Sequence, residues 1–293
     1  MADERHEDHS LSSKEFKFVC EYVHTKTGIL LNESKREMVY RRFSRIIRER
    51  KLNSFSDYCH LLQTKPDEEE NYFINAITTN LTSFFREKHH FDYLQAHEIP
   101  KILSQQKKSR EQKKSIRIWS SACSTGEEPY SIAVTLLESM EAQLQEWDVK
   151  ILATDIDSNV LAKAAEGIYD QSRIDDLPKE IQQRYFIKGT GSNSKNIKVS
   201  KKLRDLITFK QLNLLHDWPM TGLFDVIFCR NVIIYFDKPT QQELFARYYE
   251  YIKPGGLLIL GHSENLGAYQ KYFSNGGRTI FRKPEVCDQV AAG

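Results

Sequence analysis

The chain has 293 residues, of which 40% are hydrophobic and 28% charged, with a formal net charge of +2. These values are ordinary for a globular protein of one large or two small domains, and they give no overall electrostatic reason to bind nucleic acid or membranes. No apolar run approaches the ~18 residues needed to span a bilayer, and the start MADERHEDHS has no signal-peptide core. The five cysteines show no CxxC spacing, which argues against a disulfide framework and a zinc site. We therefore expect a cytoplasmic protein without a bound metal.

Residues 11–80 carry apolar positions at helical spacing, which predicts a small all-helical N-terminal domain. Its second helix, residues 35–51, holds eight Lys or Arg and two Glu. Arg41, Arg45 and Arg48 share one face of this helix, because positions i, i+4 and i+7 lie above one another. This face is either a solvated surface or a docking site for an acidic partner.

After a predicted linker helix over residues 81–115, the sequence changes to strands that alternate with helices over residues 116–283. Such apolar strands predict a doubly wound, Rossmann-like α/β sheet, mainly parallel and covered on both faces. The expected strands are IRIWSS, VKILATD, LITFKQLNLL, FDVIFCR, GGLLILG and RTIFRK. Within the crossover, residues 168–205 carry two β-prone runs around a Gly/Ser/Asn turn, which predicts a small β insertion. Residues 1–10 and 284–293 are expected to be disordered tails.

The first strand leads into WSSACSTGEEPYSIA, at the point where a glycine-rich phosphate loop is expected. This loop has a single glycine, Gly126, followed by Glu127 and Glu128. Two carboxylates would repel a pyrophosphate at this distance. They either cap the N-terminus of the following helix or bind a cationic ligand.

Polar residues also follow the next two strands, and ligands of open α/β sheets bind at the carboxyl ends of strands. Asp155 ends the second strand and suits hydrogen bonding to ribose hydroxyls, whereas Asp157 suits the N-cap of the next helix. Asn213 and Leu214 follow the third strand and suit the edge and the face of an adenine ring. These residues together favour a nucleoside ligand.

Arg230 and Asn231 follow the fourth strand in an otherwise apolar stretch of sequence, and Tyr235 comes shortly after them. They indicate either a binding site or a buried asparagine that holds a loop. Acidic partners for ribose and amine groups, without a phosphate cradle, suit S-adenosylmethionine better than NAD or ATP, because its ammonium and sulfonium are both positive.

The motifs SACSTGEEPYSIA, ATDID, FCRNVIIYF and PGGLLILGHSEN, with NAITTNLTSFFRE upstream, resemble the CheR-type chemotaxis receptor methyltransferases over about residues 12–283. The resemblance implies methyl transfer from S-adenosylmethionine to glutamate side chains of bacterial chemoreceptors, with S-adenosylhomocysteine as the product. It also implies that Asn80, Thr82 and Arg86 reach the cofactor, with Arg86 at its carboxylate. By the same resemblance, the pocket is completed by Glu127 or Glu128, Asp155, Asn213, Leu214, Arg230 and Asn231.

The resemblance further implies chemoreceptors as the partners of a monomer, with no nucleic acid and no membrane insertion. The basic helix would face the acidic methylation region of the receptor, and the β insertion would dock the receptor's C-terminal peptide. The insertion reads Lys188-Gly-Thr-Gly191, with a lysine where an arginine is expected. The alternatives are a methyltransferase acting on nucleic acid or another protein, and a non-catalytic S-adenosylmethionine sensor.

A glutamate acceptor has a reference pKa near ~4.3 and is already an anionic nucleophile at neutral pH. In-line displacement at the methyl carbon therefore needs no general base, and we identify no histidine beside the strand ends. We predict that Arg230, Asn231 and Tyr235 hold the incoming carboxylate. Tyr235 and Arg230 are thus the predicted catalytic residues, with Tyr235 nearest the methyl group.

Overall fold

The computed structural model describes residues 10–108 and 114–285, which form two compact units. The first unit comprises the described residues up to Thr79 together with Tyr235–Asp237, and the second comprises the remainder. The tails predicted to be disordered fall almost entirely outside the described residues.

The described part of the first unit is all-helical before residue 80, as predicted. Its helices are α1 (Ser13–Thr27), η1 (Glu33–Lys35), α2 (Arg36–Glu49), α3 (Phe55–Thr64) and α4 (Pro66–Ile77). Ser12 and Glu15 form a reciprocal capping box at the start of α1, and Pro66 occupies the first position of α4, where its missing N–H costs nothing. Apolar side chains from all four α-helices form the core, among them Val23, Phe43, Leu62 and Phe73.

A short segment from late in the chain completes this unit. The N–H of Leu30 donates to the carbonyl of Tyr235 at 2.8 Å, and Ile29 forms an antiparallel bridge with Phe236. The sequence predicts that this segment belongs to the sheet domain, because nothing in FCRNVIIYF indicates pairing with a residue some two hundred positions earlier.

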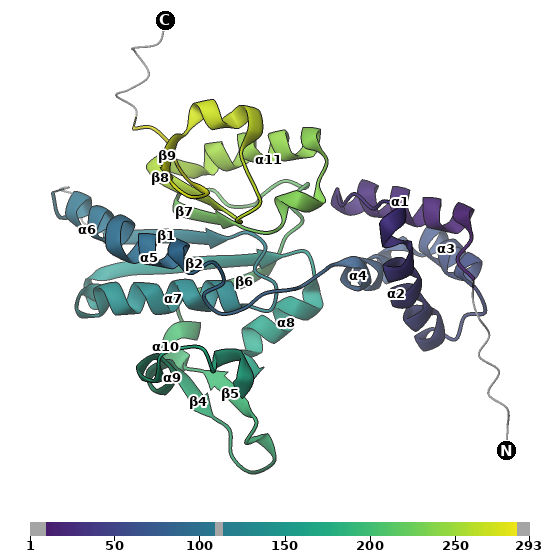
Figure 1. The fold of residues 1–293 in the computed structure, drawn as a ribbon, viewed down its shortest axis with the longest axis horizontal. Helices are drawn as coiled ribbons and strands as arrows, with labels where there is room; N and C mark the ends of the chain where they lie inside the picture. Colours follow the sequence, from purple (N-terminus) through teal and green to yellow (C-terminus); the bar gives the residue numbers. More distant parts are fainter. Residues whose placement is uncertain (1–9, 109–113, 286–293) are drawn as a thin grey trace, which may run out of the picture. The chain divides into compact units, whose positions relative to one another are not determined.

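The second unit is built on a seven-stranded sheet with the order β6-β2-β1-β7-β8-β10-β9 (Figure 1). Its strands are β1 (Lys114–Ser120), β2 (Trp147–Asp155), β6 (Ile207–Gln211), β7 (Phe224–Cys229), β8 (Ile252–Leu260), β9 (Ser274–Gly277) and β10 (Ile280–Arg282). The first five strands named are parallel to one another, whereas β10 pairs antiparallel with both β8 and β9. The predicted doubly wound sheet is confirmed, and the strand order reverses between β1 and β7, where such folds bind ligands.

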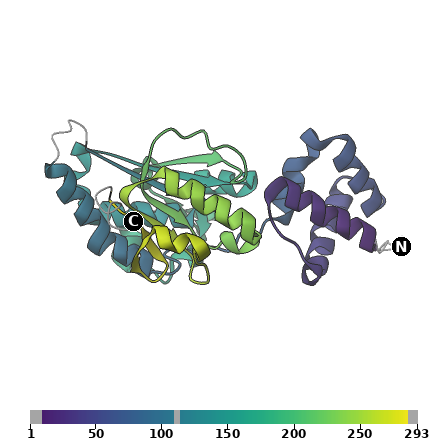
Figure 2. The ribbon, with the colours of Figure 1, turned by 90° about the horizontal axis from the view of Figure 1, so that it is seen from above.

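Helices cover both faces of this sheet. α7 (Glu127–Met140) and α8 (Ser158–Glu166) lie on one side, and α11 (Lys238–Tyr251) covers the other (Figures 1 and 2). Residues 81–108, in the region predicted as a linker helix, belong to the second unit. Its helices α5 (His89–Tyr93), η2 (Leu94–Glu98) and α6 (Ile99–Lys108) supply Phe91, Leu94 and Ile99 to the same core as α7.

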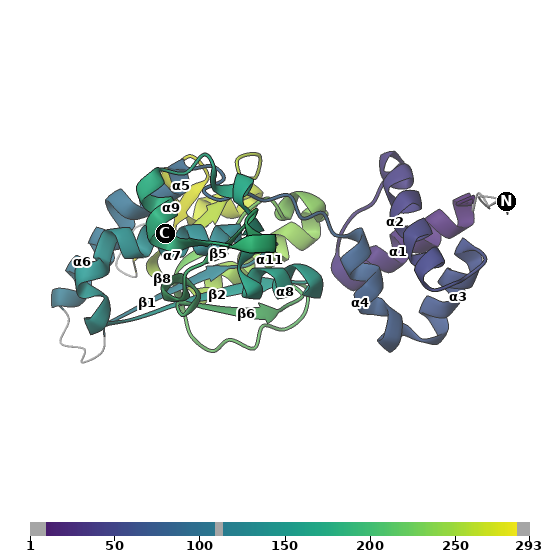
Figure 3. The same cartoon turned by 90° about the horizontal axis from the view of Figure 1, so that it is seen from below.

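The predicted β insertion is present beside α7, on the side of the sheet away from α11 (Figures 1 and 3). It contains β3 (Ile168–Asp170), η4 (Gln171–Ile174), α9 (Lys179–Tyr185), β4 (Phe186–Lys188), η5 (Gly191–Asn193), β5 (Asn196–Val199) and α10 (Lys201–Arg204). The three strands are antiparallel in the order β3-β5-β4, so β4 is an edge strand. Within the described ranges, no helix is long and apolar enough to cross a bilayer.

Candidate active site

The loop between β1 and α7 uses its glycine for close packing. Gly126 has φ +97°, and a Cβ there would lie 2.8 Å from the Cβ of Ala164 and 2.9 Å from the hydroxyl oxygen of Tyr169. Only glycine fits both the left-handed backbone and the close approach of α8. The single glycine therefore serves helix packing.

Asp155 ends β2 and is buried against this loop. Its carboxylate accepts hydrogen bonds from the N–H of Ser124 at 2.8 Å and from the N–H of Asp157 at 3.0 Å. Burial raises the pKa of Asp155 to about 6, although these hydrogen bonds favour the ionised form. Asp157 caps α8 as predicted, because its side chain accepts the N–H groups of Asn159 and Val160.

The segment that follows the first unit lies beside the same loops. The side-chain amide of Asn80 donates to Asp157 at 2.8 Å, and the carbonyl of Thr82 accepts from Arg173 of η4 at 2.6 Å. Arg86 donates to a carbonyl within its own segment. The structure thus brings the segment containing Asn80, Thr82 and Arg86 to the carboxyl end of the sheet.

Glu127 is fully buried at the start of α7 and has partners on both oxygens. One oxygen forms an ion pair with Arg173, and the other accepts from the hydroxyl of Thr125 at 2.6 Å. The Arg173 side chain is 38% exposed, so the cationic partner of Glu127 borders solvent.

Glu128 and Arg230 form a more deeply buried pair. Arg230 places one guanidinium nitrogen 2.9 Å from Glu128 and another 3.2 Å from Glu87, and its side chain is only 2% exposed. Ser120 donates to the second oxygen of Glu128 at 2.7 Å. The guanidinium predicted to hold an incoming carboxylate is thus enclosed by two carboxylates of the protein itself. This geometry fits a residue that positions its neighbours, and the catalytic role of Arg230 stays a prediction.

Asn231 is held from two sides at the end of β7. Its backbone has φ +58°, a left-handed conformation that is uncommon outside glycine. Its N–H donates to Glu264 at 2.8 Å, and its side-chain amide donates to Glu87 at 3.3 Å.

Burial alone would raise the pKa of Glu87, but Arg230 and the hydrogen bonds hold it below its ordinary value. Glu87 and Glu264 were missed as site residues, although both stand in motifs that carry the resemblance.

His262 is a further residue at this edge of the sheet that the sequence analysis did not identify. β8 ends at Leu260, so this exposed histidine comes only two residues after a strand end, and its backbone N–H donates to Glu87. The expectation that no histidine lies beside the strand ends is therefore wrong. The signal was available in GGLLILGHSEN, where His262 directly follows the last glycine of the strand.

The end of β6 completes this edge of the sheet. The N–H of Leu212 donates to the carbonyl of Asp155 at 2.9 Å, which places Asn213 and Leu214 next to β2. Asn213 accepts the N–H of Leu215 in a tight turn, and the side chain of Leu214 is buried.

Tyr235 is grouped with the first unit, whereas the other predicted site residues lie in the second. It is half-buried, and its carbonyl accepts from Leu30. Its proximity to the transferred methyl group stays a prediction.

Carboxylates outnumber guanidinium groups among the described residues at this edge. The carboxylates are Glu87, Glu127, Glu128, Asp155, Asp157 and Glu264, and the arginines are Arg86, Arg173 and Arg230. An excess of negative charge fits a ligand that carries an ammonium and a sulfonium, and a buried aspartate at the end of β2 fits its ribose. The doubly wound sheet and this acidic edge define the class of S-adenosylmethionine-dependent methyltransferases.

Two family models match the chain, namely "CheR methyltransferase, SAM binding domain" over residues 80–281 and "CheR methyltransferase, all-alpha domain" over residues 14–78. The protein belongs to the CheR methyltransferase family, and its cofactor is S-adenosylmethionine. The resemblance inferred from the motifs is confirmed.

Curated relatives match over nearly their full length. Chemotaxis protein methyltransferase 2 of Pseudomonas aeruginosa is 43% identical over 269 residues, covering 92% of each chain. The chemotaxis protein methyltransferases of Salmonella typhimurium and Escherichia coli are 42% and 41% identical, and both alignments cover 93% of this chain and 91% of the relative.

Proposed function

We propose that the protein methylates glutamate side chains of bacterial chemoreceptors in the cytoplasm, forming the methyl esters used in chemotactic adaptation. The observation that carries this proposal is the match to chemotaxis protein methyltransferases across both units of the chain. The acidic, phosphate-free edge of the sheet supports the same reaction.

S-adenosylmethionine supplies an electrophilic methyl carbon on a positively charged sulfur. We assign Asp155 to the ribose hydroxyls, because it is a buried acceptor at the end of β2. Of the paired glutamates we assign Glu127 to the ammonium, because its partner Arg173 borders solvent, whereas Glu128 is committed to Ser120 and Arg230.

Further residues complete the proposed cofactor site. Arg86 pairs with the carboxylate of the methionine end, and Asn80 and Thr82 lie on the same segment. Asn213 and Leu214 receive the adenine edge and face from the end of β6. Arg230 and Asn231, which follow β7, complete the proposed pocket.

The acceptor glutamate is ionised at neutral pH, so the protein's task is alignment rather than proton removal. Positioning the acceptor oxygen in line with the methyl carbon and the sulfur is worth several kcal/mol. Tyr235 is proposed to orient one carboxylate oxygen through its hydroxyl. Arg230 holds Glu128 and Glu87 in place, and through Glu87 it also supports Asn231.

The receptor-docking surface is proposed on α2. On its inner side, Arg42 binds the carbonyl of Ile77, and Arg50, directly after the helix, binds the carboxylate of Glu69. Arg41, Arg45 and Arg48 remain on the outer face, where the first two side chains are 74% and 76% exposed. An exposed row of arginines suits an acidic helix surface through salt-sensitive contacts.

The β insertion is proposed to bind a receptor tail peptide. β4 is an edge strand whose backbone can pair with an added strand. Gly189 shapes the hairpin beside it, because a Cβ there would lie 2.1 Å from the carbonyl oxygen of Asn193. Lys188 supplies the positive charge that precedes this turn.

The experiment that tests this function offers the full-length protein S-adenosylmethionine labelled in its methyl group, together with a receptor cytoplasmic fragment, DNA or RNA. We expect label only in the receptor fragment. Label in nucleic acid would support the alternative substrate class. Cofactor binding without transfer to any receptor would support a sensor and contradict the proposed function.

A further inference from the structure

Glu264 is a buried carboxylate that the proposed reaction leaves without a role. It is 5% exposed and lies in the loop that follows β8. One oxygen accepts the N–H groups of Gly261 at 2.7 Å and Asn231 at 2.8 Å. The other lies 3.4 Å from the N–H of Ile234. A single side chain therefore binds backbone groups from the loops that follow two adjacent strands.

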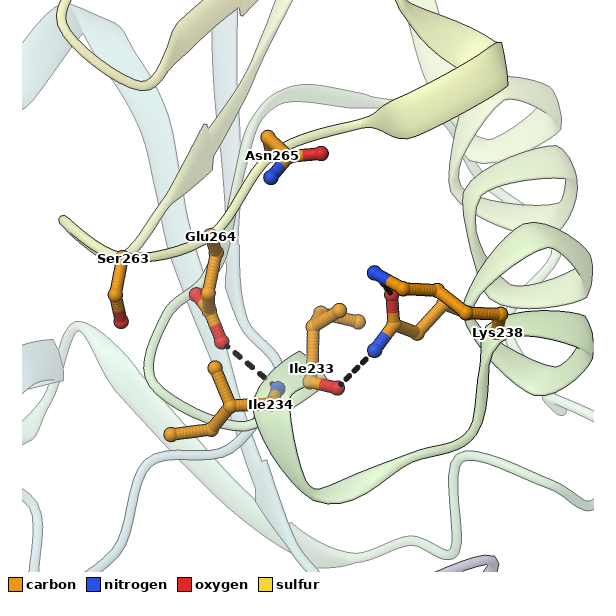
Figure 4. A pocket seen from close by; sticks show the side chains of 7 residues that line it. Ile233, Ile234, Lys238, Ser263, Glu264 and Asn265 are labelled. Atoms are coloured by element: carbon orange, nitrogen blue, oxygen red, sulfur yellow. Dashed lines mark hydrogen bonds between the residues drawn. The ribbon is translucent and has the colours of Figure 1, made fainter.

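The close-up in Figure 4 shows this arrangement beside a small cavity of about 60 Å³. Glu264 points toward the backbone of Ile233 and Ile234, and a dashed line marks its bond to the Ile234 N–H. Burial raises the pKa of Glu264, although these backbone N–H groups favour its ionised form. The carboxylate is thus satisfied by backbone donors rather than by a surface cation.

Gly261 makes this close junction possible. A Cβ at this position would lie 2.6 Å from the side-chain nitrogen of Asn231 and 2.8 Å from an oxygen of Glu264. Real Cβ atoms do not approach other atoms so closely, so any larger residue pushes the two loops apart. The junction therefore needs the acceptor at Glu264 and the absence of a side chain at Gly261.

The junction acts on a residue in a strained conformation. Asn231 has φ +58°, and non-glycine residues persist in that region only when their surroundings hold them. Glu264 holds the backbone N–H of Asn231 while Glu87 holds its side chain. Loss of the Glu264 carboxylate would let Asn231 relax toward an ordinary conformation.

We propose that Glu264 is a positioning residue for methyl transfer, whose carboxylate fixes the loop after β7 so that Asn231 lies in its binding conformation at the cofactor. This inference rests on the proposed function for its catalytic consequence, but its consequence for cofactor binding is independent of the methyl acceptor. Glu264 acts through Asn231 and touches no reacting atom.

The test compares Glu264→Gln with the wild type and with Glu98→Gln. The glutamine side chain keeps the volume of Glu264 but has no charge and one acceptor oxygen instead of two, so its hold on the loop after β7 is weakened. Glu98 is also buried in the second unit, but it pairs with Arg282 of β10. Both variants are expected to melt at a lower temperature, which makes E98Q the control for loss of a buried charge.

Only E264Q is expected to weaken S-adenosylhomocysteine binding, by about tenfold to a hundredfold in calorimetry, as for an unsatisfied buried group. Its kcat at saturating cofactor should fall by about tenfold, whereas KM for the receptor should change by less than about twofold. Wild-type affinity and kcat in E264Q, or equal losses in E98Q, would overturn the proposal.

Hydrogen exchange on the wild-type protein keeps the proposal testable if E264Q does not fold. The amides of Asn231 and Gly261 should exchange slowly, because both donate to a buried carboxylate. Fast exchange at both amides would overturn the proposal. If the wild type binds cofactor but methylates no receptor, the proposed function fails, while the affinity of E264Q still decides the role of Glu264.

Discussion

Arg230 and Glu128 are 102 positions apart in the sequence, yet the guanidinium of one lies 2.9 Å from the carboxylate of the other. The pair joins the loop after β7 to the first turn of α7, on either side of the point where the strand order reverses. Two glutamates at the start of a helix are therefore compatible with the fold because arginines from elsewhere in the chain neutralise them.

Removing Arg230 should destabilise the protein strongly. Arg230→Ala leaves the buried Glu128 and the half-buried Glu87 without their cation, which costs about 3–5 kcal/mol of unfolding free energy. Urea denaturation measures this loss. Arg184→Ala is the matched control, because Arg184 also pairs with two carboxylates, Glu138 and Glu141, but is 44% exposed. Equal effects of the two substitutions would contradict a buried ion-pair network around Arg230.

Asp155 should be needed for cofactor binding. Asp155→Ala removes a buried acceptor and should weaken S-adenosylhomocysteine binding by roughly 1–3 kcal/mol. Calorimetry with an unchanged affinity would remove Asp155 from the site.

Asp155 should also make stability depend on pH. Its folded pKa of about 6 lies above its ordinary value of 3.8, so folding disfavours ionisation and costs about 3 kcal/mol above pH 6. This cost falls as the pH drops from about 6 toward 4. Between about pH 7.5 and pH 5, the ligand-free wild type should therefore gain roughly 1 kcal/mol relative to Asp155→Asn. Identical pH profiles in urea unfolding would refute the raised pKa.

Reversing charge on the outer face of α2 should impair receptor docking alone. Arg41→Glu combined with Arg45→Glu should raise KM for the receptor at low salt and leave cofactor affinity unchanged. Lys14→Glu with Lys17→Glu changes the same charge on the exposed surface of α1 and serves as the control. If both pairs have the same effect on receptor KM, the face of α2 is only solvated.

Shortening the β4–β5 hairpin should abolish tail binding. Deletion of residues 189–196 removes the turn and the first residue of β5, so the edge of β4 loses its support. A receptor C-terminal peptide should no longer bind in fluorescence anisotropy, while S-adenosylhomocysteine should bind normally. Undiminished peptide affinity would contradict strand addition at this edge.

Tyr235→Phe should lower kcat by about tenfold to a hundredfold with little change in cofactor affinity, because only the orienting hydroxyl is lost.

At saturating substrates, kcat should stay flat across neutral pH, without a limb near ~6.5. Burial lowers the pKa of His90 to about 3, so this histidine is neutral throughout. His262→Gln is the control, and a limb in the wild type that disappears in this variant would identify a histidine base.

The fold was predictable because its signals are local. Apolar runs such as VKILATD indicate buried strands wherever they occur, and the hairpin before β5 follows from its turn residues. The antiparallel strand β9 was not predicted, since SNGG has no β-prone residue and pairs only because β10 lies beside it. Residues 81–115 read only as a linker in the sequence for a similar reason: the packing of Phe91, Leu94 and Ile99 in the same core as α7 depends on contacts that sequence spacing does not reveal.

The candidate site was predictable as a set of positions but not as a set of contacts. Strand ends identify Asp155, Arg230 and Asn231, because parallel strands present their carboxyl ends at one edge. Which side chains meet there depends on side-chain length and burial. The sequence therefore could not reveal that Arg230 forms ion pairs with Glu128 and Glu87, or that Glu264 accepts a hydrogen bond from the backbone of Asn231.

The chemical nature of the methylated group tests the central claim most directly. The receptor fragment labelled by the wild-type protein is isolated and treated with mild alkali, and the volatile label is collected. A glutamate methyl ester releases its methyl group as methanol, so the label should leave the protein in volatile form. Label that stays bound to the receptor through this treatment would show methylation of an amine or another stable group, and would contradict a glutamate O-methyltransferase.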